Sequence, residues 1–220
     1  MKKTALFLSV LSLSLTSGVS ASQADYHVWQ DGETGMSMSY PDTWRQGNSK
    51  APDDILTLLA PNDDGGEPVC RVRAREDGRF EFYPIGYSEA VQKKAYNEEF
   101  WDNYLASYDR IMIHDYKETT GIGRGFGSSV IVSYKTKHPV EGRQRSALLA
   151  SGLYNGTAYI LECSADTVVF NDWYGRFASI LKSMDTRKVT HELVRGDNPD
   201  MSGHNTVGFK DKTERYRFNQ

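Results

Sequence analysis

The sequence predicts an α+β protein that combines antiparallel strands with two helices. Short runs of alternating apolar and polar residues recur along the chain, which is typical of strands with one buried face. Two of these runs are joined by Asn155-Gly156, the strongest short signal for a hairpin. Two other segments, residues 88–108 and 169–184, carry apolar side chains at helical spacing.

The N-terminus predicts a secretory signal peptide over residues 1–24. Lys2 and Lys3 precede the apolar run ALFLSVLSLSL, and the small residues that follow suit cleavage after Ala21 or Ala24. The run is shorter than the roughly 20 apolar residues that span a bilayer. We therefore expect a periplasmic or secreted protein with no membrane anchor once the signal is cleaved.

The charge pattern argues against nucleic acid as a partner. The chain has 26 basic and 29 acidic residues, and removal of Lys2 and Lys3 leaves 24 basic residues against the same 29 acidic ones. The two signs are interspersed, whereas a general nucleic-acid binder needs a concentrated basic face. We expect no nucleic-acid partner.

The period of two predicts a series of strands. In the first hairpin, around the turn-like DGETG, Met36, Met38 and Tyr40 alternate with serines, so these three side chains should be buried. The expected strands cover residues 26–30, 35–40, 55–60, 69–75, 111–117, 126–138, 143–154 and 157–165.

Two amphipathic helices are expected. In residues 88–108, with Ser88 as a candidate N-cap, one side gathers Ala90, Val91, Trp101, Leu105 and Tyr108. Tyr96 and Phe100 fall on the opposite, polar side, and we expect them to contact a protein partner. Residues 169–184 predict a second helix that packs on the sheet through Phe170, Trp173, Phe177, Ile180, Leu181 and Met184.

The boundaries follow from these elements. Residues 25–184 form the α+β domain, and residues 185–220 form a polar, irregular C-terminal tail, either mobile or draped over the domain. The tail has few aliphatic residues, but its aromatic side chains are further candidates for partner contact. These are Phe209, Tyr216 and Phe218.

The two cysteines predict a disulfide bond. Cys70 alternates in phase with Val72, and Cys163 with Leu161, so each thiol should point to the buried face of a strand. In an oxidising compartment an isolated pair is most simply bonded. The alternative is two buried free thiols.

The glycine-rich stretch GIGRGFG, residues 121–127, predicts a structural role. A dinucleotide-binding loop needs G-x-G-x-x-G and a following helix, but Phe126 occupies the third glycine position and a strand follows. The glycines instead leave room for a neighbouring backbone or ring. We expect no nucleotide or other cofactor.

No motif predicts a catalytic or metal site. The five histidines are scattered without H-x-x-H spacing, and no G-x-S-x-G nucleophile motif is present. Glu162 interrupts an apolar strand on the face opposite Cys163. We expect it on the solvent side of the sheet, the alternative being a buried acid with a shifted pKa.

The segment GMSMSYPDTW, residues 35–44, resembles the opening of PsbP-like domains, a superfamily that includes the PsbP subunit of photosystem II and DcrB-type bacterial envelope proteins. The later strands VIVSYKTK and LYNGTAYILECSA and a closing helix follow in similar order. The resemblance spans residues 28–184. It implies an α+β sandwich, with an antiparallel sheet covered by helices and no catalytic centre, in a family of binding or assembly modules.

These observations lead to an expected function. We expect an exported, non-enzymatic binding or assembly module that acts on an envelope or secreted protein. The alternative is a periplasmic small-molecule or metal-binding protein with a pocket between sheet and helix. A secreted hydrolase with an unrecognised site is a third alternative.

Overall fold

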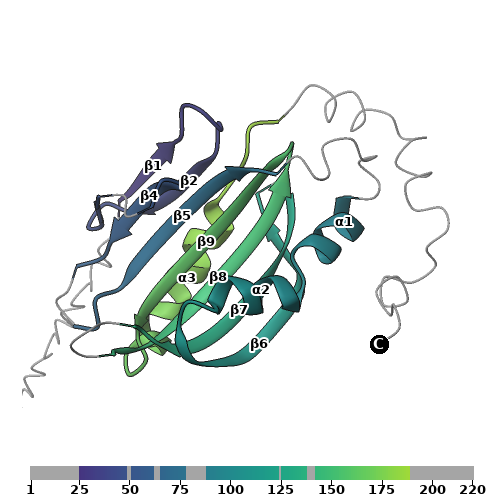
Figure 1. Cartoon of the computed structure of the whole chain (residues 1–220). Coiled ribbons are helices and arrows are strands. Elements are labelled where there is room, and N and C mark those ends of the chain that lie inside the picture. Colours follow the sequence, from purple (N-terminus) through teal and green to yellow (C-terminus); the bar gives the residue numbers. More distant parts are fainter. Residues whose placement is uncertain are drawn as a thin grey trace, which may run out of the picture.

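A seven-stranded antiparallel sheet forms the centre of the described structure (Figure 1). The computed structural model describes residues 25–48, 51–61, 65–77, 88–123, 125–137 and 142–188. The strand order is β3-β4-β5-β9-β8-β7-β6. The strands are β3 (Arg45–Gln46), β4 (Asp54–Leu59), β5 (Val69–Glu76), β6 (Asp109–Ile122), β7 (Gly125–Lys135), β8 (Gln144–Tyr154) and β9 (Thr157–Asp166).

Two layers cover the sheet. On one face lie α1 (Ser88–Ala95) and α2 (Glu98–Leu105), and on the other lies α3 (Phe170–Ser183) (Figure 1). The hairpin of β1 (Tyr26–Gln30) and β2 (Ser37–Pro41) forms a separate two-stranded sheet that packs beside α3. The expected α+β sandwich is therefore confirmed.

The β8–β9 hairpin has the predicted Asn-Gly turn. Asn155 and Gly156 both adopt positive φ, 49° and 72°, which is the geometry of a two-residue turn that matches the strand twist. The glycine-rich stretch contributes the end of β6 and the beginning of β7, which pair antiparallel. A Cβ on Gly127 would overlap the carbonyl oxygen of Ser151 on β8, so this glycine admits a neighbouring backbone, as expected.

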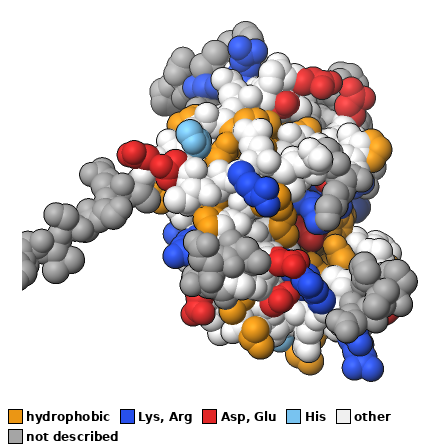
Figure 2. Space-filling view, turned by 90° about the vertical axis from the view of Figure 1, so that its left-hand side faces the viewer, with side chains coloured by type: hydrophobic (Ala, Val, Ile, Leu, Met, Phe, Trp, Pro, Cys, Tyr) orange, Lys and Arg blue, Asp and Glu red, His pale blue; other side chains and the backbone are white. Residues whose placement is uncertain are grey.

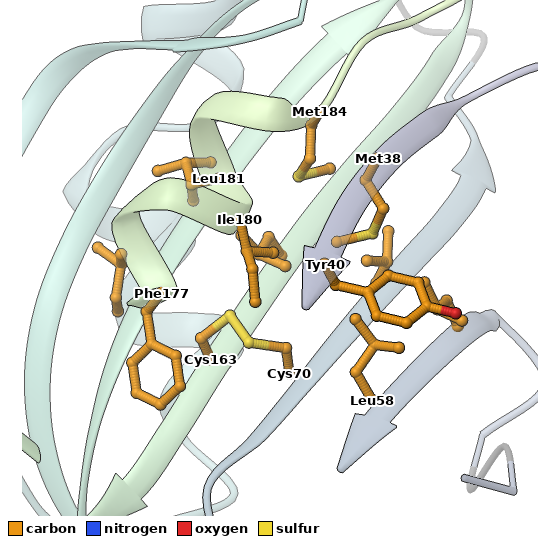
Figure 3. Close-up of a cluster of buried hydrophobic side chains, with 14 of the residues drawn as sticks. Met38, Tyr40, Leu58, Cys70, Cys163, Phe177, Ile180, Leu181 and Met184 are labelled. Carbon is orange, nitrogen blue, oxygen red and sulfur yellow. A yellow bond between two sulfur atoms is a disulfide. The ribbon is translucent and has the colours of Figure 1, made fainter. Parts of the chain in front are cut away.

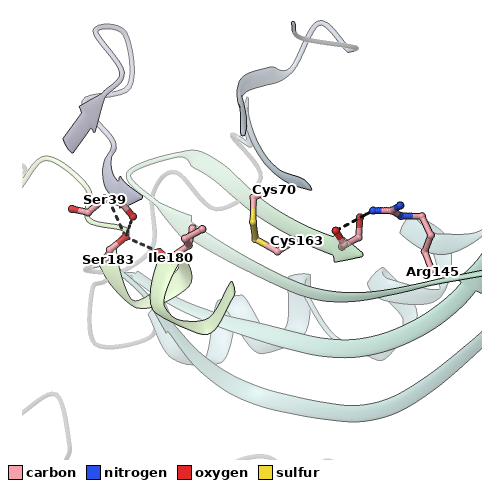
Figure 4. The surroundings of a disulfide bond; sticks show 7 residues. Ser39, Cys70, Arg145, Cys163, Ile180 and Ser183 are labelled. Atoms are coloured by element: carbon pink, nitrogen blue, oxygen red, sulfur yellow. Dashed lines mark hydrogen bonds between the residues drawn. A yellow bond between two sulfur atoms is a disulfide. The ribbon is translucent and has the colours of Figure 1, made fainter. Parts of the chain in front are cut away.

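Cys70 and Cys163 form the predicted disulfide bond. The two residues lie directly opposite each other on β5 and β9, with their sulfur atoms 2.02 Å apart. Both are at most 1% exposed, on the face that α3 covers (Figures 3 and 4). The bond therefore lies inside the larger hydrophobic core.

That core joins α3, the β1–β2 hairpin and the sheet (Figure 3). All six apolar residues predicted for the buried side of α3 are at most 6% exposed, as are Met36, Met38 and Tyr40 of the hairpin. Ser183 fastens the end of α3 to β2, because its hydroxyl donates to the carbonyl of Ser39 (2.9 Å) and accepts from the Ser39 amide (3.0 Å) (Figure 4).

The chain continues in contact with the domain after α3. Asp185 pairs with Ser37 of β2 through two backbone hydrogen bonds of 2.8 Å, and Thr186 is buried. Ordered contacts thus reach at least two residues past the expected boundary at Met184. The expected signal peptide and the tail residues Phe209, Tyr216 and Phe218 lie outside the described residues.

The expected single helix over residues 88–108 is wrong, because the segment divides into α1 and α2. Asn97 is the N-cap of α2, and its side-chain oxygen accepts a hydrogen bond from the Phe100 amide (3.1 Å). A side chain that bonds the backbone in this way competes with continuous helix and starts a new one. The break allows the chain to turn at Tyr96.

The surface on the β1–β4 side mixes acidic, basic and small hydrophobic areas, as the interspersed sequence predicts (Figure 2). None of the helices in the described residues is both long and apolar enough to cross a bilayer.

Substitution of Gly127 tests its close approach to β8, and substitution of Gly175 in α3 serves as the control. Gly127→Ala should destabilise the protein by about 3 kcal/mol, the upper end of overpacking effects, because the new methyl group would overlap the Ser151 carbonyl. Gly175→Ala in α3 meets no atom within 4 Å and should stabilise by about 0.5–1 kcal/mol through helix propensity. Urea unfolding measures both, and a neutral Gly127→Ala would contradict the close approach.

Candidate binding surface

Half of one sheet face has no helix over it in the described structure. The residues Trp101 and Leu105 of α2 pack on apolar side chains of β7, β8 and β9, ending at Ile160. Beyond β9, the sheet continues through β5, β4 and β3, and no described helix lies above β5 and β4 on this face (Figure 1). Three of the four β5 side chains on this face are arginines, whereas the strands beneath α2 present apolar side chains.

Alternation places three arginines of β5 on this face. Cys70 and Val72 point into the α3 core, so Arg71, Arg73 and Arg75 point to the opposite side. We call Arg71, Arg73 and Arg75 the arginine strip.

Glu162 lies at the border between the covered and the uncovered halves. Contrary to expectation, it is only 3% exposed. The hydroxyl of Tyr104 donates to its Oε2 (3.1 Å), and those of Tyr108 and Tyr134 donate to its Oε1 (3.3 and 3.4 Å). Three phenols thus replace the water that a solvent-facing carboxylate would have, which is the condition for burying a charge.

Arg73 is held by the same network. Its Nε donates to Oδ1 of Asp54 (2.9 Å), and its Nη1 donates to the Tyr104 hydroxyl (2.8 Å). Its guanidinium also lies 5.5 Å from the centre of the Tyr104 ring. The arginine therefore reaches Glu162 through one tyrosine, and its position is fixed by three contacts.

The environment keeps the phenols protonated. Burial, followed by the charge of Glu162, raises the pKa of Tyr104 and of Tyr108 far above the ordinary value, and raises the pKa of Tyr134 to about 12. Burial lowers the pKa of Arg73, but Tyr104, Glu162 and Asp54 together outweigh it and raise that pKa. At neutral pH the network therefore holds a charged arginine and neutral tyrosines.

Arg71 occupies the middle of a row across three strands. It lies directly opposite Thr57 of β4 on one side and Glu162 of β9 on the other. Its Nε and the Thr57 hydroxyl are buried and have no hydrogen-bond partner among the described residues. The carboxylate beside it is engaged by the tyrosines, so Arg71 offers a donor that nothing described accepts.

Tyr96 does not lie on a solvent-exposed face, which corrects the expectation for the first helix. Its side chain is 0% exposed, packs with Leu153 and Ala158, and donates from its hydroxyl to Asp77 Oδ2 (2.8 Å). The turn between the two helices, which helical periodicity does not register, directs it into the core. It is therefore excluded as a direct partner contact.

Phe100 is partly buried. It packs edge-on against Tyr96, with ring centres 4.8 Å apart, and stacks on Tyr104 at 6.1 Å. The structure thus brings the two predicted aromatic residues together, but as one packed cluster. A partner contact for Phe100 stays a prediction.

Other polar groups form smaller sets. His114 Nε2 lies 2.7 Å from the Ser133 hydroxyl, which in turn lies 2.7 Å from that of Ser146. Among the described residues no carboxylate contacts the second ring nitrogen of His114, so this histidine–serine contact lacks the third member of a triad. Nor do those residues contain a group of three or more His, Cys, Asp or Glu that could hold a metal ion.

Sequence reasoning missed the arginine strip and the tyrosine cage, by which we mean Tyr104, Tyr108 and Tyr134 around Glu162. The sequence nevertheless contains signals for both. The alternation in VCRVRARE places the arginines on one face. A glutamate inside the apolar strand YILECSA, together with Tyr108 on the apolar side of the predicted helix and Tyr104 at the edge of that side, is the sequence signal for the tyrosines around Glu162. The pattern does not reveal which helix covers Glu162.

Substitution of Glu162 tests the cage. Glu162→Gln should lower the free energy of unfolding by about 1–3 kcal/mol, because the amide keeps only one accepting oxygen for three hydroxyl donors. The control is Glu33→Gln in the exposed turn between β1 and β2, which should change stability by less than about 0.5 kcal/mol. If urea titration gave the same change in unfolding free energy for Glu162→Gln and Glu33→Gln, the burial of Glu162 among the tyrosines would be contradicted.

The raised tyrosine pKa values predict a loss of stability in alkali. The pKa of Tyr104, Tyr108 and Tyr134 is higher in the folded than in the unfolded chain, so their contribution is complete below about pH 10 and is lost as the pH rises through the folded values. Unfolding free energy measured from about pH 9 to 12 should fall, and it should fall less in Tyr108→Phe. An unchanged slope in that variant would contradict the assignment.

Comparison with known proteins identifies the fold. No protein-family model matches the sequence, and no curated protein is detectably similar to it. The PsbP protein CyanoP of Synechocystis matches with a TM-score of 0.52 and 11% identity, over 79% of this chain and 99% of its own. LpqN of Mycobacterium tuberculosis, described as involved in cell envelope biogenesis, matches with a TM-score of 0.50 and 14% identity, over 74% and 91%.

A third structure, the Ran-binding protein Mog1p of Saccharomyces cerevisiae, matches with a TM-score of 0.49 and 9% identity, over 74% of this chain and 96% of its own. At these identities the matches to CyanoP and LpqN concern the fold alone. They agree with the observed order of strands and helices and with the resemblance of residues 28–184. The chain has the PsbP-like fold.

Proposed function

We propose that this protein is an exported, non-enzymatic binding module for an envelope or secreted protein. The observation that carries the proposal is the uncovered half-face, where the exposed Arg75 and the half-buried Arg71 lie beside a network that holds Arg73 in place. Helices close the apolar parts of the sheet, whereas this face presents charged side chains outward. Charged side chains of this kind can give specificity in binding a protein partner.

Export is supported by two independent features. The first 24 residues have the pattern of a signal peptide. The Cys70–Cys163 bond belongs to the class of disulfides that persist in oxidising compartments. LpqN, which shares the fold, is described as involved in cell envelope biogenesis. Together these points support a periplasmic or secreted location.

The network supports binding rather than chemistry. Both oxygens of Glu162 already accept hydrogen bonds from tyrosine hydroxyls, and burial holds the surrounding tyrosines in their protonated form. A general acid or base needs a pKa near the working pH and a free site for the proton. These groups are instead arranged to position Arg73.

A second candidate function has a specific location. A cleft of about 250 Å³ lies between α3 and strands β6 to β8. Its lining includes the apolar side chains of Ile131, Leu148 and Leu181 and two lysines, Lys117 on β6 and Lys182 on α3. This is the position expected for a small-molecule pocket between sheet and helix.

In-cell crosslinking tests the proposed function. A photoreactive amino acid at position 75 should capture one major envelope or secreted protein, and the purified pair should bind each other in solution. The matched control is the same group at position 171, an exposed site on α3 behind the sheet. Because position 171 faces away from the arginine strip, it should not capture that protein.

The same cells report on export. The mature protein should begin after Ala21 or Ala24, and its mass should be two hydrogens below that of the reduced chain. An uncleaved chain with free thiols would contradict export. No capture at position 75, under conditions where crosslinking is efficient, would contradict the binding module and favour the cleft at α3.

A further inference from the structure

We propose that the arginine strip of β5 receives an extended acidic segment of the protein partner. This inference rests on the proposed function and adds the chemistry of the partner. It concerns the side chains of Arg71, Arg73 and Arg75, together with Thr57 on the neighbouring strand.

The spacing of the strip matches an extended chain. Residues two apart on a strand lie roughly 6.6–6.8 Å apart and point to the same side. An extended segment with acidic residues at every second position presents carboxylates at the same interval and on one side. The guanidinium groups of Arg71 and Arg75 can then each meet one carboxylate, for which their planar donors are suited, while Arg73 stays paired with Asp54.

Two of the three arginines on the strip have no ion-pair partner among the described residues. Arg73 is paired with Asp54, and Glu162 is occupied by tyrosine hydroxyls. Arg71 and Arg75 form no ion pair within the described part of the chain. The whole chain has a net charge of −3, so three arginines in a row give this face a local charge opposite to that of the chain and attract an acidic segment.

The centre of the strip contains unused donors. The Arg71 Nε and the Thr57 hydroxyl, on directly opposed residues, are both buried without a partner among the described residues. A buried donor without an acceptor is costly. An acceptor that reached either atom would therefore offset a cost present in the free protein.

The partial burial of the arginine strip favours a narrow ligand. The side chain of Arg73 is only 23% exposed, and Arg71 is half-buried. Tyr104 and Tyr108 of the α2 region border the strip on one side. An extended peptide can follow the strand closely enough to reach the partly buried side chains, whereas a flat anionic membrane surface meets only the exposed Arg75.

Peptide binding tests the inference on the mature protein. A fluorescein-labelled peptide of alternating glutamate and threonine should bind by fluorescence anisotropy, and more tightly than a peptide of the same composition with consecutive glutamates. Arg71→Gln and Arg75→Gln should each weaken binding about tenfold, as expected for loss of a hydrogen bond to a charged group. Arg176→Gln, the same charge change on α3, should leave binding unchanged.

The variants also separate this inference from the proposed function. The arginines at 71 and 75 are half-buried and exposed, respectively, and thermal melting checks that both variants fold. If they still bind the crosslinked partner with wild-type affinity, the acidic-segment proposal is overturned while the binding module stands. Equal binding of both peptides, or stronger arginine-dependent binding to phosphatidylglycerol vesicles, also overturns it.

Discussion

The pairing of β5 with β9 sets the positions of both the disulfide bond and the polar network around Glu162. Because successive side chains of a strand alternate between faces, the register that places Cys70 opposite Cys163 also places Arg71 opposite Glu162 on the other face. A slip of one residue would exchange these sets and drive arginines into the α3 core. The disulfide on one face thus holds the register on which the polar network of the other face depends.

The two faces are completed in different ways. Behind the sheet, α3 and the β1–β2 hairpin close an apolar core around the disulfide. In front, α2 covers apolar residues only as far as Ile160, and Glu162 lies at its margin. Tyrosines suit such a margin, because their rings pack against the core while their hydroxyls satisfy the carboxylate.

Because the area covered by α2 ends beside Glu162, the β5 half of this face has no described helix above it. An arginine side chain is expensive to bury unless paired, so a helix over β5 would need an acid for every guanidinium. The described residues provide Asp54 for Arg73. Arg71 and Arg75 remain available to a partner, on a surface that the tyrosine network holds in place.

Local patterns predicted the elements but not how they cover one another. The strands, the Asn155-Gly156 turn and the buried side of α3 follow from periodicity, since burial on one face imposes a period on the sequence. The break at Asn97 was missed, because a capping asparagine inside an otherwise helical pattern is a weak signal. Burial of Tyr96 follows from that break.

By itself the sequence determined the α+β class, the strand order along the chain and the faces of Cys70, Cys163 and Glu162, because alternation depends only on the strand. Tertiary structure alone decided that Glu162 is buried and that the β5 arginines are left uncovered. The physical reason is that exposure depends on which distant helix lies above a face. The length and placement of α2 set that limit, not the residues of β5 or β9.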